Sequence, residues 1–242
     1  MRMTENKQEL KDEFVELKNI FTNIASHYDN MNRIISLGLD SLWRKKAVKL
    51  LNIEPEAKIL ELGCGTCELT IELAEKINEE GQIIALDCNP KMLELGRRKI
   101  KEKRLGQKIN LIKGDARDIP FIIPEFDYVG IAFTLRNIPE RLKVLQEMKR
   151  VTKSGGVIFS LDIFEPTLLI YRQLFLYYFN HIIPYLGKVI FNQHQEYNWL
   201  PQSLKRFITI KKLKNILAEL NLAEIKVETM MLGAIALHFG KK

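Results

Sequence analysis

The stretch Glu61-Leu62-Gly63-Cys64-Gly65-Thr66 decides how this sequence folds. A short apolar strand predicted over Ala57–Leu62 leads into it, and a helix predicted over Glu68–Glu79 follows it. The two glycines allow the backbone to turn tightly and to approach a ligand without a Cβ clash. The helix then directs its free amide groups at that ligand. The sequence therefore predicts a nucleotide-type binding loop between a strand and a helix.

Apolar strands alternate with helices beyond this loop. We predict strands at Gln82–Leu86, Lys108–Lys113, Phe126–Phe133 and Gly156–Ile163, and helices at Pro90–Arg104 and Pro139–Thr152. This alternation indicates an α/β fold with a mainly parallel sheet covered on both faces. The end of the chain differs, because a helix predicted over Gln202–Leu220 precedes two strands at Ala223–Thr229 and Ala234–Phe239. The turn between those strands is so short that they can pair only antiparallel.

A parallel sheet closed by an antiparallel hairpin is typical of the Rossmann-like class I methyltransferases that use S-adenosyl-L-methionine. Ligands of open α/β sheets bind beyond the carboxyl ends of the strands. Asp87 stands at one such end, where it can accept both hydroxyls of a ribose. Asp115 and Ala116 stand at the next one, where a carboxylate and an amide suit the edge of an adenine ring, although Asp115 could instead cap a turn. Together with the loop residues Glu61, Gly63 and Gly65, they form the predicted cofactor site, with S-adenosyl-L-methionine as the cofactor.

Dinucleotide cofactors fit this loop less well. Glu68 occupies the place of the third glycine in a dinucleotide-binding loop, and a glutamate at a helix N-terminus repels a pyrophosphate. A zwitterionic aminoacyl group carries less negative charge and suits the loop better. Asp87 alone does not discriminate, because both kinds of cofactor contain the ribose.

The bulk composition is that of one folded domain. The chain has 242 residues, of which 46% are hydrophobic and 28% charged, with a net charge of +7. No signal peptide or transmembrane segment is expected, and three irregularly spaced cysteines fit a reducing cytoplasm. The positive charge suits nucleic acid, an anionic membrane or acidic small molecules, and it suits equally well a surface whose charges are simply solvated.

The chain divides into four stretches. Residues 1–54 form an expected helical lid, with one helix over 8–30 and a second that Ser36 could cap and that ends near Leu51. Residues 55–163 are the cofactor-binding core, 164–200 an aromatic-rich insertion for the substrate, and 201–242 a C-terminal helix and hairpin. The insertion is too polar to span a bilayer but could line a tunnel or lie on a membrane surface.

Several longer motifs resemble the UbiE/MenG family of quinone C-methyltransferases, from about residue 20 to 240. They are His27-Tyr28-Asp29-Asn30-Met31-Asn32, Ser36-Leu37-Gly38, Trp43-Arg44, Asp118-Ile119-Pro120-Phe121, Phe126-Asp127, Phe133-Thr134-Leu135-Arg136-Asn137-Ile138, Arg150-Val151, Gly155-Gly156 and Gly233-Ala234-Ile235-Ala236-Leu237-His238. The resemblance implies methyl transfer to a ring carbon of a prenylated quinol, either demethylmenaquinol or the related ubiquinone precursor. It also implies cofactor contacts at Thr66, Asp87, Asp115 and Ala116.

Three positions depart from the family pattern. The family tends to have glycine where Cys67 stands and often serine where Ala132 stands. Asp162-Ile163-Phe164 replaces Glu-Phe-Ser. These departures bear on the identity of the substrate more than on the class of reaction.

The reaction needs a group that favours loss of a phenolic proton, whose pKa is about 10 in water. Arg136 is the first candidate, because a permanent positive charge stabilises a phenolate, although it could instead form a surface ion pair with Asp127 or Glu140. Tyr28 and His27 are further catalytic candidates on the lid, where they could instead serve packing and capping.

Three more side chains are predicted to bind the substrate. Phe133 and Asn137 flank Arg136, and Tyr171 lies in the aromatic insertion. We expect no metal ligands. The expected partner is a lipophilic quinol, with the insertion either touching the inner face of the cytoplasmic membrane, forming a homodimer interface or packing as ordinary core.

Other functions remain as alternatives. A nucleic-acid methyltransferase suits the charge, but Phe133-Thr134-Leu135-Arg136 replaces the Asn/Asp-Pro-Pro-aromatic motif and no Pro-Cys nucleophile is present. A methyltransferase for another small hydrophobic molecule, a cofactor-binding module without turnover, or a dehydrogenase would also have such a loop. Cys64 and Cys67 form a C-x-x-C pattern, but a zinc site would need a second pair. Cys88 beside Asp87 makes a redox role conceivable.

Overall fold

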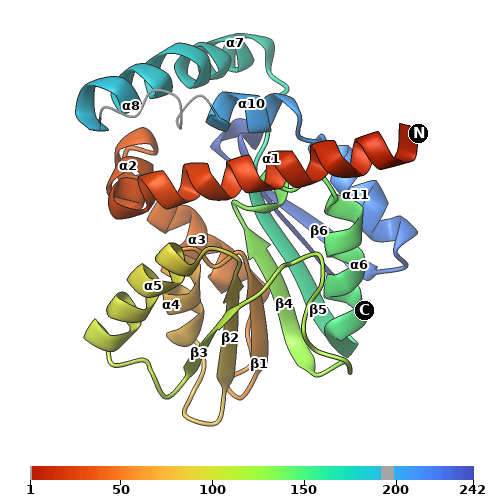
Figure 1. Ribbon diagram of the computed structural model, residues 1–242. Helices are drawn as coiled ribbons and strands as arrows, with labels where there is room; N and C mark the ends of the chain where they lie inside the picture. Colours follow the sequence, from red (N-terminus) through yellow and green to blue (C-terminus); the bar gives the residue numbers. More distant parts are fainter. Residues whose placement is uncertain (1, 192–198) are drawn as a thin grey trace.

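A computed structural model describes residues 2–191 and 199–242, with the side chains of 13–190 and 199–242. The part of the expected insertion at 192–198 lies outside the described residues. The core is a seven-stranded sheet of order β3-β2-β1-β4-β5-β7-β6 (Figure 1). Its strands are β1 (Lys58–Leu62), β2 (Gln82–Asp87), β3 (Ile109–Lys113), β4 (Phe126–Ala132), β5 (Thr152–Ile163), β6 (Ala223–Met230) and β7 (Ile235–Lys241). Strands β1 to β5 pair in parallel and β7 runs antiparallel to both neighbours, which confirms the predicted class I methyltransferase plan.

Helices cover both faces of the sheet, as the unbroken apolar strands require. One core cluster joins the sheet to α3 (Leu39–Leu51), α4 (Glu68–Ala74) and α5 (Pro90–Glu102). The other joins it to α6 (Arg141–Val151) and α11 (Ile210–Glu219). Helix α4 ends earlier than predicted, because Asn78 donates its backbone amide to Pro55 and its side chain accepts the amides of Glu80 and Gly81, which turns the chain.

The N-terminal segment crosses the carboxyl ends of the parallel strands (Figure 1). The single helix predicted over 8–30 is wrong. Helix α1 (Arg2–Ile24) is followed by a 3₁₀ turn, η1 (Ala25–His27), and then by α2 (Tyr28–Ile35). The turn redirects the chain so that Met31 becomes fully buried in a small apolar cluster with Ile24. Gly38, rather than Ser36, precedes α3, although the Ser36 hydroxyl does accept the amide of Asp40.

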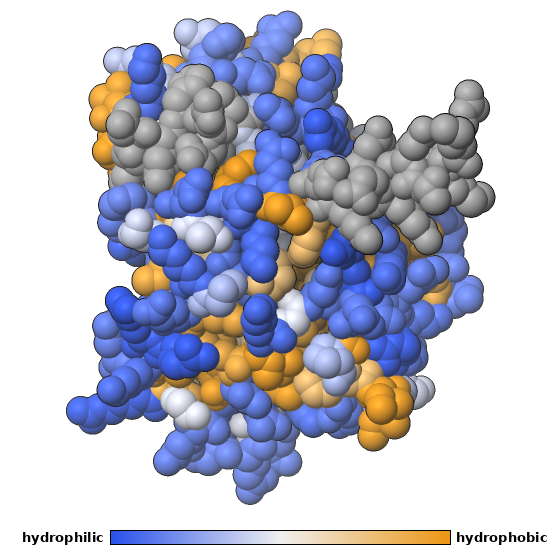
Figure 2. All heavy atoms as spheres, viewed as in Figure 1, coloured by the Kyte–Doolittle hydropathy of each residue, from blue (hydrophilic) through white to orange (hydrophobic). Residues whose placement is uncertain are grey.

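The aromatic insertion forms a helical layer above the sheet, with α7 (Leu169–Tyr177), the π-helical turn η3 (Tyr178–Ile182) and α8 (Ile183–Phe191). Apolar surface shows at both ends of this layer, at the top of Figure 2. The helix predicted over Gln202–Leu220 is also wrong. It is divided into α10 (Trp199–Lys205) and α11, because the Thr209 hydroxyl accepts the amide of Lys212 and starts a new helix there. In the part of the chain that the structure describes, no helix combines the length and apolarity needed to cross a bilayer.

Candidate active site

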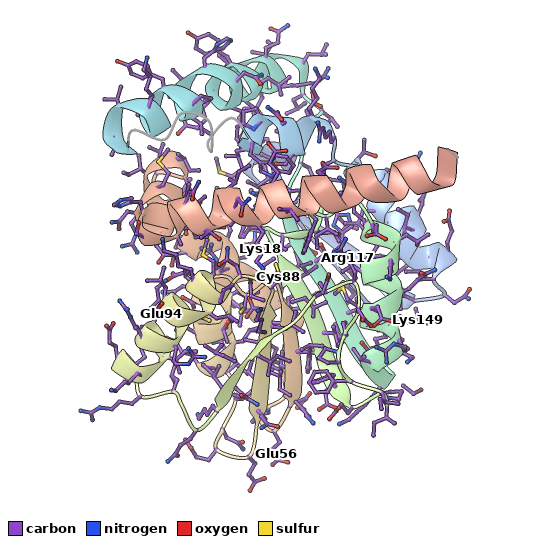
Figure 3. All side chains as sticks on the ribbon, in the orientation of Figure 1. Lys18, Glu56, Cys88, Glu94, Arg117 and Lys149 are labelled. Atoms are coloured by element: carbon purple, nitrogen blue, oxygen red, sulfur yellow. The ribbon has the colours of Figure 1, made fainter. Side chains whose placement is uncertain are left out.

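Three cavities open at the carboxyl end of the parallel strands. The first, of about 760 Å³, lies between α1 and the ends of β1, β2 and β3. The second, of about 1200 Å³, lies among α2, α3, α7 and η3, and the third, of about 350 Å³, lies beside the glycine loop. Cys88 and Arg117, which line the first cavity, lie at the opposite end of the sheet from Glu56 (Figure 3). Tyr28 and Phe133 line all three cavities, so the cavities meet at these two rings.

The glycine loop separates the first and third cavities. Gly63 has φ of +64°, and a Cβ there would collide with the side chain of Thr134, whose hydroxyl donates to the Gly63 carbonyl at 3.1 Å. Gly65 has φ of +53°, and a Cβ there would meet no atom within 4 Å. The space in front of Gly65 is therefore open to a ligand, as the sequence predicts.

Asp87 ends β2 and shapes the floor of the first cavity. Its carboxylate accepts the backbone amide of Gly65 at 2.8 Å and that of Asn89 at 2.7 Å. Burial raises the pKa of Asp87, although these amide hydrogen bonds oppose the rise. Each carboxylate oxygen has lone pairs left to accept a further hydroxyl, so the predicted role toward a ribose is sterically and chemically available.

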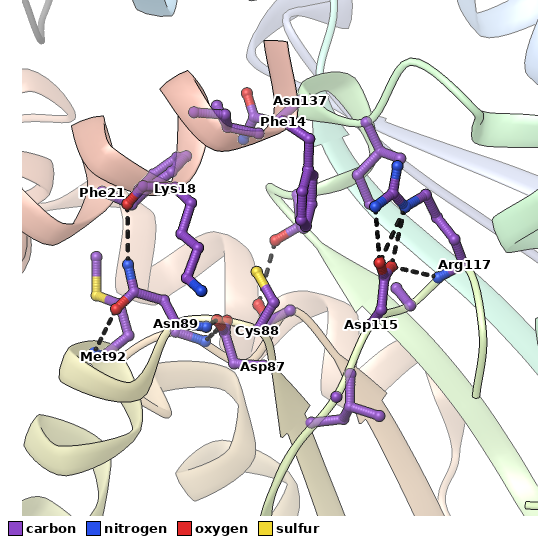
Figure 4. A pocket seen from close by; sticks show the side chains of 18 of the residues that line it. Phe14, Lys18, Phe21, Asp87, Cys88, Asn89, Met92, Asp115, Arg117 and Asn137 are labelled. Atoms are coloured by element: carbon purple, nitrogen blue, oxygen red, sulfur yellow. Dashed lines mark hydrogen bonds and ion pairs between the residues drawn. The ribbon is translucent and has the colours of Figure 1, made fainter. Parts of the chain in front are cut away.

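Asp115 and Ala116 follow β3 on the same wall, as predicted. Arg117 clasps the Asp115 carboxylate through Nε at 3.0 Å and Nη2 at 2.7 Å, and its guanidinium lies 4.1 Å from the centre of the Phe14 ring (Figure 4). Burial works to raise the pKa of Asp115, but the hydrogen bonds and charge of Arg117 outweigh it and hold that pKa below its ordinary value. The acid is thus kept ionised at the edge of the cavity, with α1 covering it.

Glu61 and Arg44 both line the third cavity. Glu61 is completely enclosed, and burial raises its pKa to about 8, although the Thr70 hydroxyl that donates to it at 2.5 Å opposes the rise. Arg44 is paired with Asp40 at 2.5 Å and lies over the Phe133 ring, 5.2 Å from its centre.

These residues fit S-adenosyl-L-methionine. The first cavity offers Asp87 to a ribose diol and apolar side chains such as Leu17 and Met92 to an adenine ring. The third offers Glu61 to the ammonium of an aminoacyl arm. Since the two cavities share Gly63, Gly65 and the junction with the second cavity, one ligand can occupy both and present its sulfonium there.

Phe133 is held in a strained conformation at that junction. It has φ of +54°, which is costly for a residue with a bulky side chain. Its amide donates to Leu161 and its carbonyl accepts Nη1 of Arg136 at 2.6 Å, so both sides of the residue are fixed. The strain ends β4 one residue earlier than predicted and turns the ring toward all three cavities.

Arg136 lines the second cavity and its partner is Asp162, at 2.8 Å. The alternative of a surface pair with Asp127 or Glu140 is wrong, because Arg136 is nearly enclosed and Asp162 has no exposed surface. Asp162 also accepts the backbone amide of Arg136 at 3.1 Å. The buried carboxylate therefore fixes the guanidinium in position at the edge of the cavity.

The remaining predicted residues are distributed unevenly. Tyr171 lines the second cavity, whereas Asn137 lines the first, where its side-chain oxygen accepts the indole N–H of Trp199 at 3.1 Å. His27 is exposed and lines none of the three cavities, because the 3₁₀ turn directs Tyr28 inward instead.

Hydrogen bonds fasten the N-terminal segment to the cofactor loops. The Thr66 hydroxyl donates to Asp29 of α2 at 2.6 Å, and the other oxygen of Asp29 pairs with Lys99 of α5. The side chain of Asn89 donates to Thr22 of α1 at 2.9 Å. In this structure the Thr66 hydroxyl is therefore engaged by the N-terminal segment, whose helix α1 lines the first cavity.

Sequence reasoning missed several lining residues of the first cavity. Phe14, Lys18 and Phe21 reach it from α1, and Asn89 and Arg117 reach it from the loops after β2 and β3 (Figure 4). Spacing could have found the first three, since they lie on one helical face. Nothing local indicated that this face would cover the cofactor side.

The cysteines of the loop are free thiols packed into the core. Cys67 has φ of +67°, which explains why glycine suits this position in the resembled family. Its side chain is fully buried against Gly96 of α5, where a Cβ would collide with the sulfur. Cys88 lines the first cavity, and burial raises its pKa to about 11, which makes it a poor nucleophile at neutral pH.

Comparison with known proteins agrees with this geometry. The model of the ubiE/COQ5 methyltransferase family matches residues 6–242. The chain belongs to that family. It is 37% identical over 235 residues to a demethylmenaquinone methyltransferase of Bacillus cereus, covering 97% of this chain and 98% of the relative. A demethylmenaquinone methyltransferase of Geobacillus stearothermophilus is 39% identical over 223 residues, covering 92% of this chain and 95% of the relative.

Solved structures support the fold. A SAM-dependent methyltransferase from Aquifex aeolicus superposes with a TM-score of 0.60 at 17% identity, covering 88% of this chain and 96% of that one. A phosphoethanolamine N-methyltransferase from Haemonchus contortus, solved with S-adenosyl-L-methionine, superposes with a TM-score of 0.54 at 17% identity. The match covers 74% of this chain and 36% of that one. This chain is accordingly an S-adenosyl-L-methionine-dependent methyltransferase of class I fold.

Proposed function

We propose that this methyltransferase converts demethylmenaquinol to menaquinol by methylating a ring carbon. The observation that carries the proposal is the large apolar second cavity, which meets the cofactor side at Tyr28 and Phe133. The cavity is lined mainly by aromatic and aliphatic side chains, including Trp43, Phe175 and Phe179, and suits a quinol ring with a prenyl tail. Two relatives that match nearly the whole chain are named demethylmenaquinone methyltransferases, which supports the same substrate.

The residues at the junction divide the work. The cofactor supplies an electrophilic methyl group on its sulfonium. Arg136 places a fixed positive charge beside the cavity, where it stabilises a quinol oxygen that has lost its proton. Tyr28 and Phe133 hold the ring against the methyl group and exclude water from the path between them.

Incubation with methyl-labelled S-adenosyl-L-methionine and membrane lipids of a strain that lacks quinone methylation tests the proposal. We expect label in a prenylated naphthoquinone. Label in a benzoquinone instead would reassign the ring to the ubiquinone pathway. Label in another hydrophobic molecule, with none in either quinone, would refute quinol methylation while leaving the methyltransferase intact.

We also propose that the layer of α7 and α8 rests on a lipid bilayer. Leu174 is 65% exposed and Leu37 is 81% exposed, and both also line the second cavity, so its mouth opens through apolar surface. Leu169, Ile170 and Val189 extend this surface, and Lys188 adds exposed positive charge. A substrate with a prenyl tail would then pass from the membrane into the cavity without crossing water.

Flotation with vesicles of phosphatidylcholine and phosphatidylglycerol tests this contact. We expect Ile170→Asp to abolish flotation. Ile122→Asp is the matched control, because Ile122 is 93% exposed in the loop after β3, away from the mouth. If the wild type fails to float and sediments as a dimer that Ile170→Asp dissociates, the apolar face is a homodimer interface instead.

A further inference from the structure

Quinol methylation requires a group that accepts the hydroxyl proton, and the proposed substrate site is the second cavity. The described side chains that line this cavity and can ionise are Tyr28, Asp40, Arg44, Arg136, Tyr171 and Tyr178. Among the residues that the structure describes, no histidine lines this cavity, and His27 is exposed outside it. Among the described lining residues, Asp40 is the one carboxylate.

The other ionisable groups are unsuited to accept a proton. Guanidinium and phenol side chains carry their protons near neutral pH. Burial raises the pKa of Tyr171 and of Tyr178 further above the ordinary phenol value. Asp162 is ionisable but has no exposed surface, and Arg136 and the amide of Ile163 occupy its oxygens.

Asp40 has the geometry of a proton acceptor. It lies in the first turn of α3, where one oxygen pairs with Arg44 at 2.5 Å and the other accepts the Ser36 hydroxyl at 3.0 Å. Burial works to raise the pKa of Asp40, but the hydrogen bond and charge of Arg44 outweigh it, so the carboxyl is ionised at neutral pH. Each oxygen has a lone pair left for a substrate hydroxyl.

Arg44 connects this carboxylate to the junction of the cavities. It lines both the second and the third cavity and lies over Phe133, which lines all three. An ion pair in a mainly apolar cavity is costly, and a polar substrate head placed against it would offset that cost. The pair thus stands beside the place where the ring meets the methyl group.

We propose that Asp40 is the general base of the reaction and that Arg44 acts with Arg136 to stabilise the oxygen it deprotonates; this rests on the proposed function. The quinol O–H bond breaks and its proton goes to the Asp40 carboxylate. The adjacent ring carbon bonds to the methyl carbon, while the bond from that carbon to sulfur breaks and leaves its electron pair on sulfur. The ring proton at the methylated carbon then leaves to solvent, which restores the aromatic ring as a phenolate, and Asp40 returns its proton to the oxygen.

The test compares Asp40→Asn and Asp40→Glu with the wild type at saturating S-adenosyl-L-methionine and a short-tailed demethylmenaquinol. We expect Asp40→Asn to lower kcat about 100-fold, in the range of general-base losses, and to leave the affinity for the cofactor unchanged. Asp40→Glu keeps a carboxylate, so its kcat should be at least about a tenth of the wild-type value. Glu94→Gln is the matched control, because Glu94 forms an exposed i,i+4 pair with Arg98 outside the cavities.

The pH profile separates a base from a structural ion pair. The charged or titratable groups facing Asp40 are Arg44 on α3, Arg136 on η2 (Leu135–Asn137), Tyr28 on α2 and the tyrosines of α7 and η3. We expect kcat of Asp40→Asn to rise with pH from 6 to 9 while that of the wild type stays level. A ring-fluorinated, more acidic quinol should narrow the difference between the two.

Three outcomes overturn the proposal. These are a wild-type kcat in Asp40→Asn, a loss that neither pH nor the acidic quinol relieves, or a cofactor affinity that falls with kcat. A wild type that methylates no quinol would instead refute the proposed function, and this inference with it.

Discussion

The first and second cavities share Tyr28 and Phe133 but are built from different parts of the fold. The first is formed by loops at the ends of parallel strands, where backbone amides hold Asp87 and the Arg117 side chain holds Asp115. The second is formed by helices outside the parallel core, and its charged groups are held by other side chains, as in the pairs of Asp40 with Arg44 and Asp162 with Arg136. Cofactor recognition thus depends on strand-end loops of the core, and substrate recognition depends largely on the helices added to that core.

The largest expected effect concerns Glu61 beside the glycine loop and the way its burial makes the stability of the protein depend on pH. The pKa of Glu61 is about 8 in the folded protein against an ordinary 4.5, because of burial. The folded state therefore retains the proton longer, and this residue's contribution to stability is lost as pH rises from about 4.5 to 8, by up to about 1.4 kcal/mol per pH unit. In denaturant unfolding, Glu61→Gln should gain stability over the wild type between pH 5 and 9. Glu56→Gln, at an exposed turn, should show no such gain. If the difference in unfolding free energy between Glu61→Gln and the wild type were the same at pH 5 and at pH 9, the raised pKa of Glu61 would be contradicted.

On the substrate side, Arg136→Ala should destabilise the protein by about 3–5 kcal/mol, because it leaves the buried Asp162 unpaired. Arg136→Lys retains the charge and should remain folded, with strongly reduced kcat and an unchanged Kd for S-adenosyl-L-methionine. Calorimetric binding and thermal unfolding of both variants check this. If Arg136→Lys folded but no longer bound the cofactor, Arg136 would belong to the cofactor site instead of the substrate site.

On the cofactor side, Asp87→Ala should weaken binding of S-adenosyl-L-methionine about 100-fold, since hydrogen bonds to a charged acceptor contribute roughly 1.5–3 kcal/mol. The apparent affinity for the quinol should stay within a factor of two, because Asp87 does not line the second cavity. Isothermal calorimetry and KM measurements at saturating cofactor distinguish the two. If Asp87→Ala lowered the affinity for the cofactor and the affinity for the quinol equally, the two cavities would not bind their ligands independently.

The smallest effect is expected where the lid joins the two cavities. Asp29→Asn weakens the contacts to Thr66 and Lys99, and such partly exposed pairs contribute about 0–1 kcal/mol. We expect faster amide exchange in α2 and a few-fold weaker cofactor binding. Glu224→Gln, which removes an exposed pair with Lys241 at the far hairpin, should change neither. Unaltered exchange in Asp29→Asn would mean that packing alone holds the lid.

The cofactor side could be predicted from the sequence because its chemistry follows strand ends. Asp87 ends β2 and Asp115 comes two residues after β3, and parallel strands bring their carboxyl ends to one edge. The closing hairpin was predictable for a similar reason, since its turn leaves only one way to pair. These features depend on local patterns that a single sequence displays.

The substrate side could not be predicted to the same depth. The spacing of Asp40 and Arg44 is that of an ordinary surface pair on a helix, and only tertiary packing encloses it. The helix break at Ala25–His27 contains no glycine or proline that would mark it in the sequence. It accompanies the burial of Met31, which is a tertiary contact. The break before α11 did have a local signal in Thr209, which the apolar periodicity of the flanking helices obscured.

Cys67 and Gly96 form a pair of complementary size. The cysteine sulfur occupies the volume that a side chain at position 96 would need, and it does so from a backbone conformation that favours glycine. A larger residue at 96 is therefore compatible with the fold only when residue 67 becomes smaller. Across the family, these two positions should change together, so that the glycine moves from one helix to the other while the distance between α4 and α5 is conserved.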